Sequence, residues 1–376
     1  MIHPHEFDSF LRSKLDIDSY FGVPDSVLQP FCRYLVTAYG VSDRHIVGVN
    51  EGSCVALSAG RYLSTGRSAC VYMQNSGLGN AVNPVLSLIS PEVYNIPVLF
   101  VIGWRGAPGE KDEPQHIAQG SRTIQMLSLL GLDYAVLDEN SSIADITETA
   151  DHFKSLLACG NSVAFLVRKG AFEAVEYTEV DTGFSLQREQ TLEKIISAFP
   201  GDVFFGTTGV TSREIFEIRE RMGMPHCNDF LSVGSMGHTS SIALGAATGL
   251  NRPLRIWCLD GDVAALMHMG AMASIGAINA DGYIHVLLNN AEHESVGKIP
   301  TIGGQIDFCG IARACGYSNA IKVQTKEELK DVLKEIGNAV SGSVFVEICI
   351  ASGARKDLGR PTISPAVSRV QFMENI

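Results

Sequence analysis

The chain contains 376 residues, of which 45% are hydrophobic and 19% charged, a balance that excludes an intrinsically disordered protein. Its 29 basic and 41 acidic residues give a formal net charge of −12, which argues against binding to nucleic acid or to an anionic membrane surface. At about 100–200 residues per domain, two domains are expected.

Short β-branched runs bounded by glycine or proline alternate with longer helical patterns. The predicted strands, in chain order, are 44–49, 69–73, 98–102, 163–167, 203–205, 255–259, 284–288 and 344–350. The predicted helices are 79–88, 191–199, 264–278 and 326–340, the last opened by a capping box of Thr325 and Glu328. Most strands are continuous apolar runs, typical of parallel strands covered on both faces, so the predicted fold class is α/β with mainly parallel sheets flanked by helices.

The polar, turn-rich stretch around residues 176–189 shows no sustained apolar period. It is the best candidate for a linker between two α/β halves of similar length. We therefore expect one domain over 1–178, a linker over 179–189 and a second domain over 190–376.

Location and redox state follow from what the sequence lacks. No run of about 18 apolar residues occurs, so no membrane-spanning helix is expected. Residues 1–6 lack the basic and apolar stretches of a signal peptide, and we expect a cytoplasmic protein. The nine cysteines are scattered without a C-x-x-C pair, so neither disulfides nor zinc ligation is predicted, and most should be buried apolar residues.

The segment most informative about chemistry begins at residue 255. An apolar strand ends in Gly261 and Asp262, and the next strand ends in Asn289 and Asn290. Asp262 and Asn290 are about 28 positions apart, the length of a strand–helix–strand crossover, so both should lie at carboxyl ends of parallel strands. A carboxylate, an amide oxygen and backbone carbonyls suit Mg²⁺ and leave positions for diphosphate oxygens. Either pair alone would indicate only a turn, whereas the spacing favours a site.

This pattern resembles the thiamine diphosphate-binding motif of the decarboxylases and related carboligases. Further segments are similar to that family, and in particular to its phosphonopyruvate decarboxylase branch. They are Gly22–Ser26, Asn50–Gly52, Trp104–Gly106, Lys111–His116, Thr207–Arg213, Val233–His238 and Asn289–Gly297. In this order they span most of the chain, and together they are far more specific than any one of them.

The resemblance implies two domains of similar topology, one binding the aminopyrimidine of the cofactor and one its diphosphate. It also implies self-association, as a homodimer or larger, with active sites between subunits. Asp262 and Asn290 would be the Mg²⁺ ligands, with the backbone carbonyl of Glu292 as a third. The residues that the resemblance assigns to cofactor binding are Glu51, Thr207, Thr208, Gly234, Met236, Gly261, Asp262, Val263 and Asn290.

Glu51 and Met236 receive the most specific roles from the resemblance. Glu51 would hydrogen-bond N1′ of the pyrimidine, and an apolar pocket would raise its pKa so that the proton can be shared. From the residues alone, a glutamate at this place could equally be a helix cap or first-turn residue. Met236 would hold the cofactor in a bent conformation, and core filling is its alternative.

On the substrate side, Asp25, His116 and Gln115 resemble the polar residues that face the reacting carbon. An Asx turn is the alternative for Asp25, and a structural role is the alternative for His116. Three basic residues are candidates to bind the phosphonate: Arg105, Lys111 and Lys298. The alternative for each of them is a solvated charge on the protein surface.

The function implied is non-oxidative decarboxylation of 3-phosphonopyruvate to phosphonoacetaldehyde and CO₂. Sulfopyruvate or another 2-oxo acid is an alternative substrate. A non-catalytic thiamine diphosphate-binding protein is another alternative, because Val263 stands where the family usually has glycine and Ala291 and Glu292 differ from the expected Gly-Ala. A nicotinamide-dependent oxidoreductase is disfavoured because the glycine pattern at Gly77 and Gly79 fails at Val82.

Overall fold

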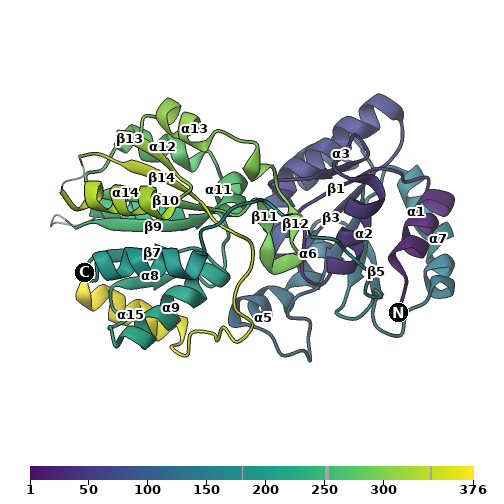
Figure 1. Ribbon diagram of the computed structural model, residues 1–376. Coiled ribbons are helices and arrows are strands. Elements are labelled where there is room, and N and C mark those ends of the chain that lie inside the picture. The colour runs from purple at the N-terminus through teal and green to yellow at the C-terminus, as the bar shows by residue number, and fades with distance from the viewer. Residues whose placement is uncertain (180, 250–253, 339–340) are drawn as a thin grey trace. The chain divides into compact units, whose positions relative to one another are not determined.

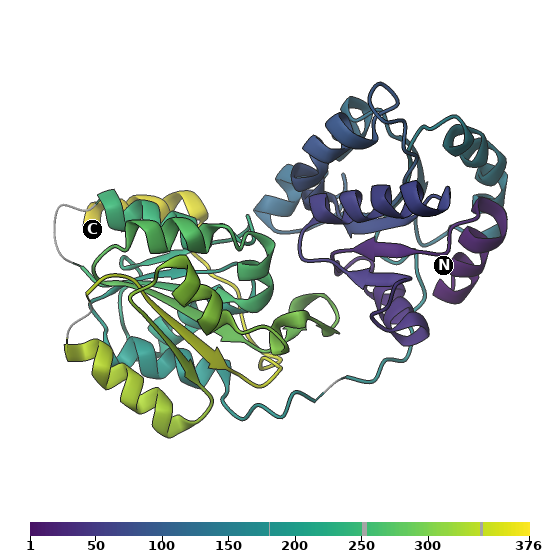
Figure 2. The same cartoon turned by 90° about the horizontal axis from the view of Figure 1, so that it is seen from above.

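The computed structural model describes residues 1–179, 181–249, 254–338 and 341–376. The chain forms two compact units, the first of Met1–Glu179 with Val296–Ile299, and the second of Val180–Ser295 with Pro300–Ile376. Each unit holds one six-stranded sheet with helices on both of its faces (Figures 1 and 2). Residues 296–299, expected in the second half, belong instead to the first unit, because Ile299 is buried in its core.

The first sheet is parallel throughout, with the strand order β2-β1-β3-β4-β6-β5. Its strands are β1 Tyr20–Gly22, β2 His45–Val47, β3 Cys70–Gln74, β4 Leu99–Gly103, β5 Asp133–Leu137 and β6 Val163–Val167. The helices of this unit are α1 Pro4–Leu15, α2 Gln29–Tyr39, α3 Glu51–Thr65, α4 Leu78–Pro84, α5 Pro114–Gly120, α6 Thr123–Leu129 and α7 Ile143–Ala158, with the short turns η1 Asn75–Gly77 and η2 Val85–Ile89.

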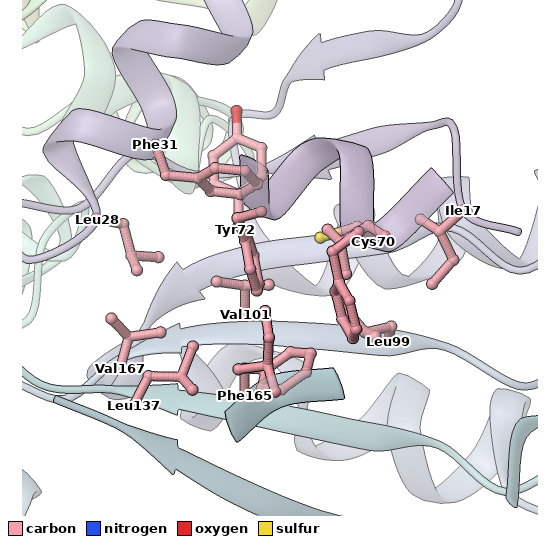
Figure 3. Packing of buried hydrophobic residues seen from close by; sticks show 14 of the residues in the cluster. Ile17, Leu28, Phe31, Cys70, Tyr72, Leu99, Val101, Leu137, Phe165 and Val167 are labelled. Atoms are coloured by element: carbon pink, nitrogen blue, oxygen red, sulfur yellow. The ribbon is translucent and has the colours of Figure 1, made fainter. Parts of the chain in front are cut away.

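Helices α1, α2 and α7 pack their apolar faces on one side of this sheet. Phe31 of α2 lies against Tyr72 of β3, and Phe165 of β6 lies under the same helices (Figure 3). Aromatic side chains remove more apolar surface from water than other side chains do, so this layer contributes strongly to the stability of the unit. Helix α3 covers β1 and β3, which places its first residue, Glu51, at the edge where the strands end.

The second sheet is also parallel throughout, in the order β13-β14-β10-β9-β7-β8. Its strands are β7 Val203–Gly206, β8 Asp229–Leu231, β9 Ile256–Gly261, β10 Tyr283–Asn289, β13 Asn319–Val323 and β14 Val344–Cys349. Its helices are α8 Arg188–Ala198, α9 Val210–Met222, α10 Thr239–Gly249, α11 Asp262–Met267, α12 Ala271–Ile278, α13 Phe308–Cys315, α14 Lys326–Asn338 and α15 Pro365–Asn375. The pair β11 Glu292–His293 and β12 Ile299–Pro300 and the turns η3 Glu294–Val296 and η4 Ile302–Gly304 follow β10.

The α/β fold class and all eight predicted strands are confirmed, with small shifts of their ends. The capping box of α14 is confirmed as well: the Thr325 hydroxyl accepts from the Glu328 amide at 3.2 Å, and the Glu328 carboxylate accepts from the Thr325 amide at 3.0 Å. Positions 339–340 of that predicted helix lie outside the described residues.

Three helix predictions need correction. The single helix expected over 264–278 is two helices, because His268 has φ −133° and ψ 47°, outside the helical region, and ends α11. The helix expected over 79–88 ends at Pro84 and continues as the π-helical segment Val85–Ile89, since proline has no N–H for the helical ladder. The helix expected over 191–199 begins three residues earlier, at Arg188.

No helix among the described residues has the length and apolar character needed to cross a bilayer. The cysteines are free thiols, and six of them are buried as expected: Cys32, Cys54, Cys70, Cys258, Cys309 and Cys349.

A buried histidine of the first unit predicts acid sensitivity. His45 is fully buried; its Nδ1 lies 2.7 Å from the Gly40 carbonyl and its Nε2 lies 2.9 Å from the Tyr72 hydroxyl. Burial lowers the pKa of His45 from 6.5 to about 4. Because the unfolded chain binds this proton more readily, the free energy of unfolding should fall by about 2 kcal/mol between pH 7 and pH 5 from this group alone.

Urea unfolding of the wild type and of His45→Gln at the two pH values measures this effect. The variant should lose less stability on acidification than the wild type. An equal loss in both would contradict the prediction.

Candidate active site

The predicted site residues of the first unit lie after the carboxyl ends of parallel strands. Asp25 follows β1, Glu51 follows β2 and Arg105 follows β4. Parallel α/β sheets bind ligands at this edge, because all strand ends and several helix N-termini meet there.

Glu51 is the first residue of α3, and Asn50 caps that helix by accepting from two backbone amides. Glu51 is only 5% exposed, and its Oε2 accepts a hydrogen bond of 2.7 Å from Asn80 Nδ2. A Cβ at Gly77 would lie 2.5 Å from Glu51 Oε1, so a larger residue there would displace the Glu51 side chain. Burial raises the pKa of Glu51, and the Asn80 hydrogen bond offsets this in part. The result is a helix-start carboxyl group that retains a proton more readily than an exposed one.

Asp25 is fully buried in the loop between β1 and α2. Its carboxylate accepts from the amides of Val27 and Leu28 at 2.9 and 3.2 Å and from Gln74 Nε2 at 2.9 Å. A Cβ at Gly103 would lie 2.0 Å from Asp25 Oδ2, so a larger residue there would displace this carboxylate. Burial raises the pKa of Asp25 despite these hydrogen bonds. The Asx turn that was the alternative for Asp25 is therefore present, and it holds the carboxylate in place.

The loop after β4 and the start of α5 carry Arg105, Gln115 and His116, and Lys111 lies between them. The Arg105 guanidinium forms a bidentate pair with Asp112 at 2.6 and 2.7 Å and donates to Ser26 Oγ at 2.7 Å. Burial and the positive charge of Arg105 lower the pKa of the half-buried His116. Gln115 Oε1 is a buried oxygen with no hydrogen-bond partner among the described residues. Asp25, Arg105 and this loop are linked through Ser26, next to Asp25 in the chain.

The two lysines proposed for the phosphonate differ in their surroundings. Lys298 pairs with Glu179. Lys111 is exposed, and the described residues provide it with no ion pair. Of the three cationic candidates, Lys111 therefore has the charge most available to an incoming anion.

In the second unit the predicted residues gather in the same way at the strand ends. Thr207 and Thr208 follow β7, and Asp262 and Asn290 follow β9 and β10, which are neighbours in the sheet. The Thr208 hydroxyl donates to the Val233 carbonyl at 2.9 Å, which ties the loop after β7 to the loop after β8. Thr207 Oγ1 is buried without a partner among the described residues, as expected of a hydroxyl that faces a ligand.

Asp262 is 2% exposed, and its Oδ2 accepts a 2.6 Å hydrogen bond from the Thr301 hydroxyl. A Cβ at Gly303 would lie 2.5 Å from this oxygen and 3.0 Å from Asn289 Oδ1, so a glycine leaves space where the oxygens converge. Burial raises the pKa of Asp262 to about 7. Val263 is the second residue of α11 and is partly exposed beside this carboxylate.

Asn290 is oriented by a charged network. Its Nδ2 donates to Glu294 Oε2 at 2.8 Å, and its Oδ1 accepts from the Glu292 amide at 3.1 Å. Arg188, with a side chain only 6% exposed, pairs with both Glu294 and Glu214 at 2.7 and 2.9 Å. Asn290 is thus fixed by a buried arginine that lies 106 positions from Glu294 in the chain.

Met236 lies on a short loop with an unusual backbone. Ser235 has φ +58° and Gly237 has φ +86°. A Cβ at Gly237 would lie 2.6 Å from the His268 ring, so this glycine permits close packing on the break between α11 and α12. Gly234 and Met236 are partly exposed. Met236 follows β8 and so lies at the same edge of the sheet as Asp262, which follows β9.

Several residues that contact the predicted ones were not identified from the sequence. They are Gln74, Asn80, Asp112, Arg188, Asn289, Glu294 and Thr301. Asn289 and Glu294 lie inside the segment Asn289–Gly297, which had already been singled out. Asp112 likewise lies inside the segment Lys111–His116. The remaining four, Gln74, Asn80, Arg188 and Thr301, carry no local signal, because their partners are distant in sequence.

Comparison with known proteins gives two matching domain families. Residues 10–126 match the thiamine pyrophosphate enzyme, N-terminal TPP binding domain, and residues 207–348 match the thiamine pyrophosphate enzyme, C-terminal TPP binding domain. The first match contains Asp25, Glu51 and His116, and the second contains Asp262 and Asn290.

Curated relatives align over most of the chain. A phosphonopyruvate decarboxylase of Streptomyces viridochromogenes is 31% identical over 94% of this chain and 89% of its own length. Another, from Streptomyces hygroscopicus, is 30% identical over 96% of this chain and 90% of its own length. A sulfopyruvate decarboxylase of Methanosarcina acetivorans is 26% identical over 87% of this chain and 86% of its own length.

Proposed function

The chain belongs to the thiamine diphosphate-dependent decarboxylases of the phosphonopyruvate decarboxylase family, and from this membership we propose that it converts 3-phosphonopyruvate to phosphonoacetaldehyde and CO₂ with Mg²⁺. The observation that carries the chemistry is the buried Glu51, whose pKa is raised at the start of α3. Its surroundings suit a carboxyl group that shares a proton with a ring nitrogen.

The residues of the second unit fit a magnesium diphosphate. Asp262 and Asn290 supply hard oxygen ligands at adjacent strand ends, and the Glu292 carbonyl is proposed as a third. The buried, unpartnered Thr207 Oγ1 and the neighbouring Thr208 are proposed to contact the diphosphate. Gly234, Met236, Gly261 and Val263 line the same strand ends and are proposed as cofactor contacts.

The residues of the first unit fit the reacting end of the cofactor. When bound, thiamine diphosphate supplies the electron sink that accepts the electrons left by departing CO₂. Glu51 would hold the proton that it shares with the pyrimidine nitrogen. Asp25, His116 and Gln115 are proposed to orient the 2-oxo acid and to move protons near its reacting carbon.

We also propose that the chain self-associates, as a homodimer or larger. Glu51 lies in the first unit and Asp262 in the second. The family resemblance implies that a complete active site combines the first unit of one subunit with the second unit of its neighbour. Dimer formation and activity should therefore be lost together on dilution.

The direct test is CO₂ release from 3-phosphonopyruvate, sulfopyruvate and pyruvate, each with thiamine diphosphate and Mg²⁺. The highest kcat/KM is expected for 3-phosphonopyruvate. Comparable turnover of pyruvate would overturn the phosphonate assignment. Cofactor binding without CO₂ release from any of the three acids would favour a non-catalytic binding protein, the alternative motivated by Val263.

Replacing Lys111 by alanine should raise KM for 3-phosphonopyruvate by about tenfold and leave kcat nearly unchanged, because a charge-assisted bond to the phosphonate contributes about 1.5 kcal/mol. Steady-state kinetics measure the split. Lys14→Ala, on the exposed face of α1, is the matched control. A fall in kcat with unchanged KM would contradict the proposed role.

Replacing Glu294 by glutamine should weaken Mg²⁺ binding in the presence of thiamine diphosphate by about 10–100-fold, because the partners that orient a metal ligand contribute this much to affinity. Activity should recover at high Mg²⁺. Titration of activity with Mg²⁺ measures the shift, and Glu327→Gln, on the exposed surface of α14, is the control. An unchanged Mg²⁺ midpoint would show that Glu294 does not position Asn290.

A further inference from the structure

Three side chains that can bind a metal lie together on β9 and β10. Cys258 and Asp260 are two residues apart on β9 and so lie on the same face of the sheet. His285 of β10 is paired in register with Cys258. The three ligand atoms all lie within 4.8 Å of one another, and no comparable group of three occurs elsewhere among residues 1–179, 181–249, 254–338 and 341–376.

Two of these groups are buried with polar atoms that lack hydrogen bonds. Cys258 and Asp260 are 0% exposed and His285 is 1% exposed. Asp260 Oδ2 and His285 Nε2 face each other at 3.6 Å, beyond hydrogen-bond distance, and within the described chain neither has a hydrogen-bond partner. Because an unpaired buried polar group is costly, and this pair is an ion pair only when the imidazole is protonated, a cation held between the two atoms would satisfy both of them.

The surroundings have the arrangement of a metal site. The 3.6 Å separation of Asp260 Oδ2 and His285 Nε2 matches the roughly 3.3–3.7 Å edge of a tetrahedron around a cation with bonds of about 2.0–2.3 Å. His285 Nδ1 lies 2.9 Å from the Tyr317 hydroxyl, which can fix the ring with Nε2 free to bind. The Phe345 ring packs edge-on against His285 at 5.2 Å and shields it.

The charges and the ligand types indicate which cation fits. A thiolate and a carboxylate carry two negative charges and a neutral imidazole none, so a divalent cation makes the buried group neutral. A sulfur and a nitrogen ligand favour Zn²⁺ over Mg²⁺, which prefers oxygen. The cation proposed for Asp262 and Asn290 is therefore of a different chemical class.

We propose that Cys258, Asp260 and His285 form a second metal site, which takes Zn²⁺ or a similar borderline-soft divalent cation. All three ligands are shut off from solvent, so the role is structural. The ion cross-links β9 and β10 just before the strand ends that carry Asp262 and Asn290. The site differs from the expectation drawn from the scattered cysteines, because its ligands converge only when two strands pair.

Cobalt titration of the full chain tests the site. Chelator-treated, reduced wild type should bind one Co²⁺ per chain with a near-ultraviolet band from thiolate-to-cobalt charge transfer. Cys258→Ser should abolish the band, and His285→Gln should weaken Co²⁺ binding by at least about tenfold. Cys349→Ser, a buried cysteine of β14, should retain both.

Two measurements keep the outcome decisive. Asp262→Asn should retain the band, which separates this site from the proposed magnesium site. Zinc-edge X-ray absorption of the wild type should show one sulfur at about 2.3 Å with lighter nitrogen and oxygen ligands, a result that does not depend on the folding of any variant. Absence of stoichiometric Co²⁺ and Zn²⁺ binding, or a band that survives in Cys258→Ser, would overturn the proposal.

Discussion

Glu51→Gln is expected to lower kcat by about 10²–10⁴-fold, the range that a positioned acid–base group contributes. The amide preserves the size of the side chain but cannot share a proton with the pyrimidine nitrogen. The hydrogen bond with Asn80 can be kept through the amide oxygen of glutamine. Since burial raises the pKa of Glu51, removing the ionisable group should leave the fold intact.

CO₂ release under cofactor saturation measures this effect, and calorimetry checks that thiamine diphosphate still binds. Glu92→Gln, an exposed glutamate of the same unit, is the matched control and should behave as wild type. A near-normal kcat of the Glu51→Gln enzyme would contradict the catalytic role of Glu51, whichever 2-oxo acid the enzyme decarboxylates.

The second large effect is expected at Asp262. Asp262→Asn should weaken thiamine diphosphate binding in the presence of Mg²⁺ by at least about 100-fold, because the negative charge of a proposed metal ligand is lost at a buried position. The hydroxyl of Thr301 can still donate to the amide oxygen, so local structure should persist. Excess Mg²⁺ should restore binding only in part.

Calorimetric titration with cofactor and Mg²⁺ gives the affinity directly. Asp331→Asn, on the exposed face of α14, controls for the change in net charge. Wild-type affinity in Asp262→Asn would place the metal elsewhere and would also remove the reason for assigning Asn290 as its second ligand.

The strands that could be predicted are those whose apolar pattern is visible within a few consecutive residues. The runs at 98–102 and 163–167 are apolar throughout because β4 and β6 are interior strands covered on both faces. The edge strands β5 and β13 are partly exposed, so their patterns were too weak to predict. The strands β1 and β8 were also missed; both are only three residues long, as is β2, which was predicted as part of the longer run 44–49. The break at His268 was missed because the apolar period continues across it.

The residues predicted to form the site divide in the same way. Asp262 and Asn290 follow strands at a recognisable spacing, and the resemblance added Glu51. The residues that orient them, Asn80 and Arg188, lie 29 positions from Glu51 and 106 from Glu294. No periodicity connects such distant positions.

The order of residues by itself determined two parallel α/β units and a pattern of acids and amides at strand ends, since burial and turn chemistry act within a few neighbours along the chain. Which side chains meet was decided by the tertiary structure. The contact of Asp260 with His285 exists only because β9 and β10 pair in one register, and strand register depends on the packing of the whole sheet.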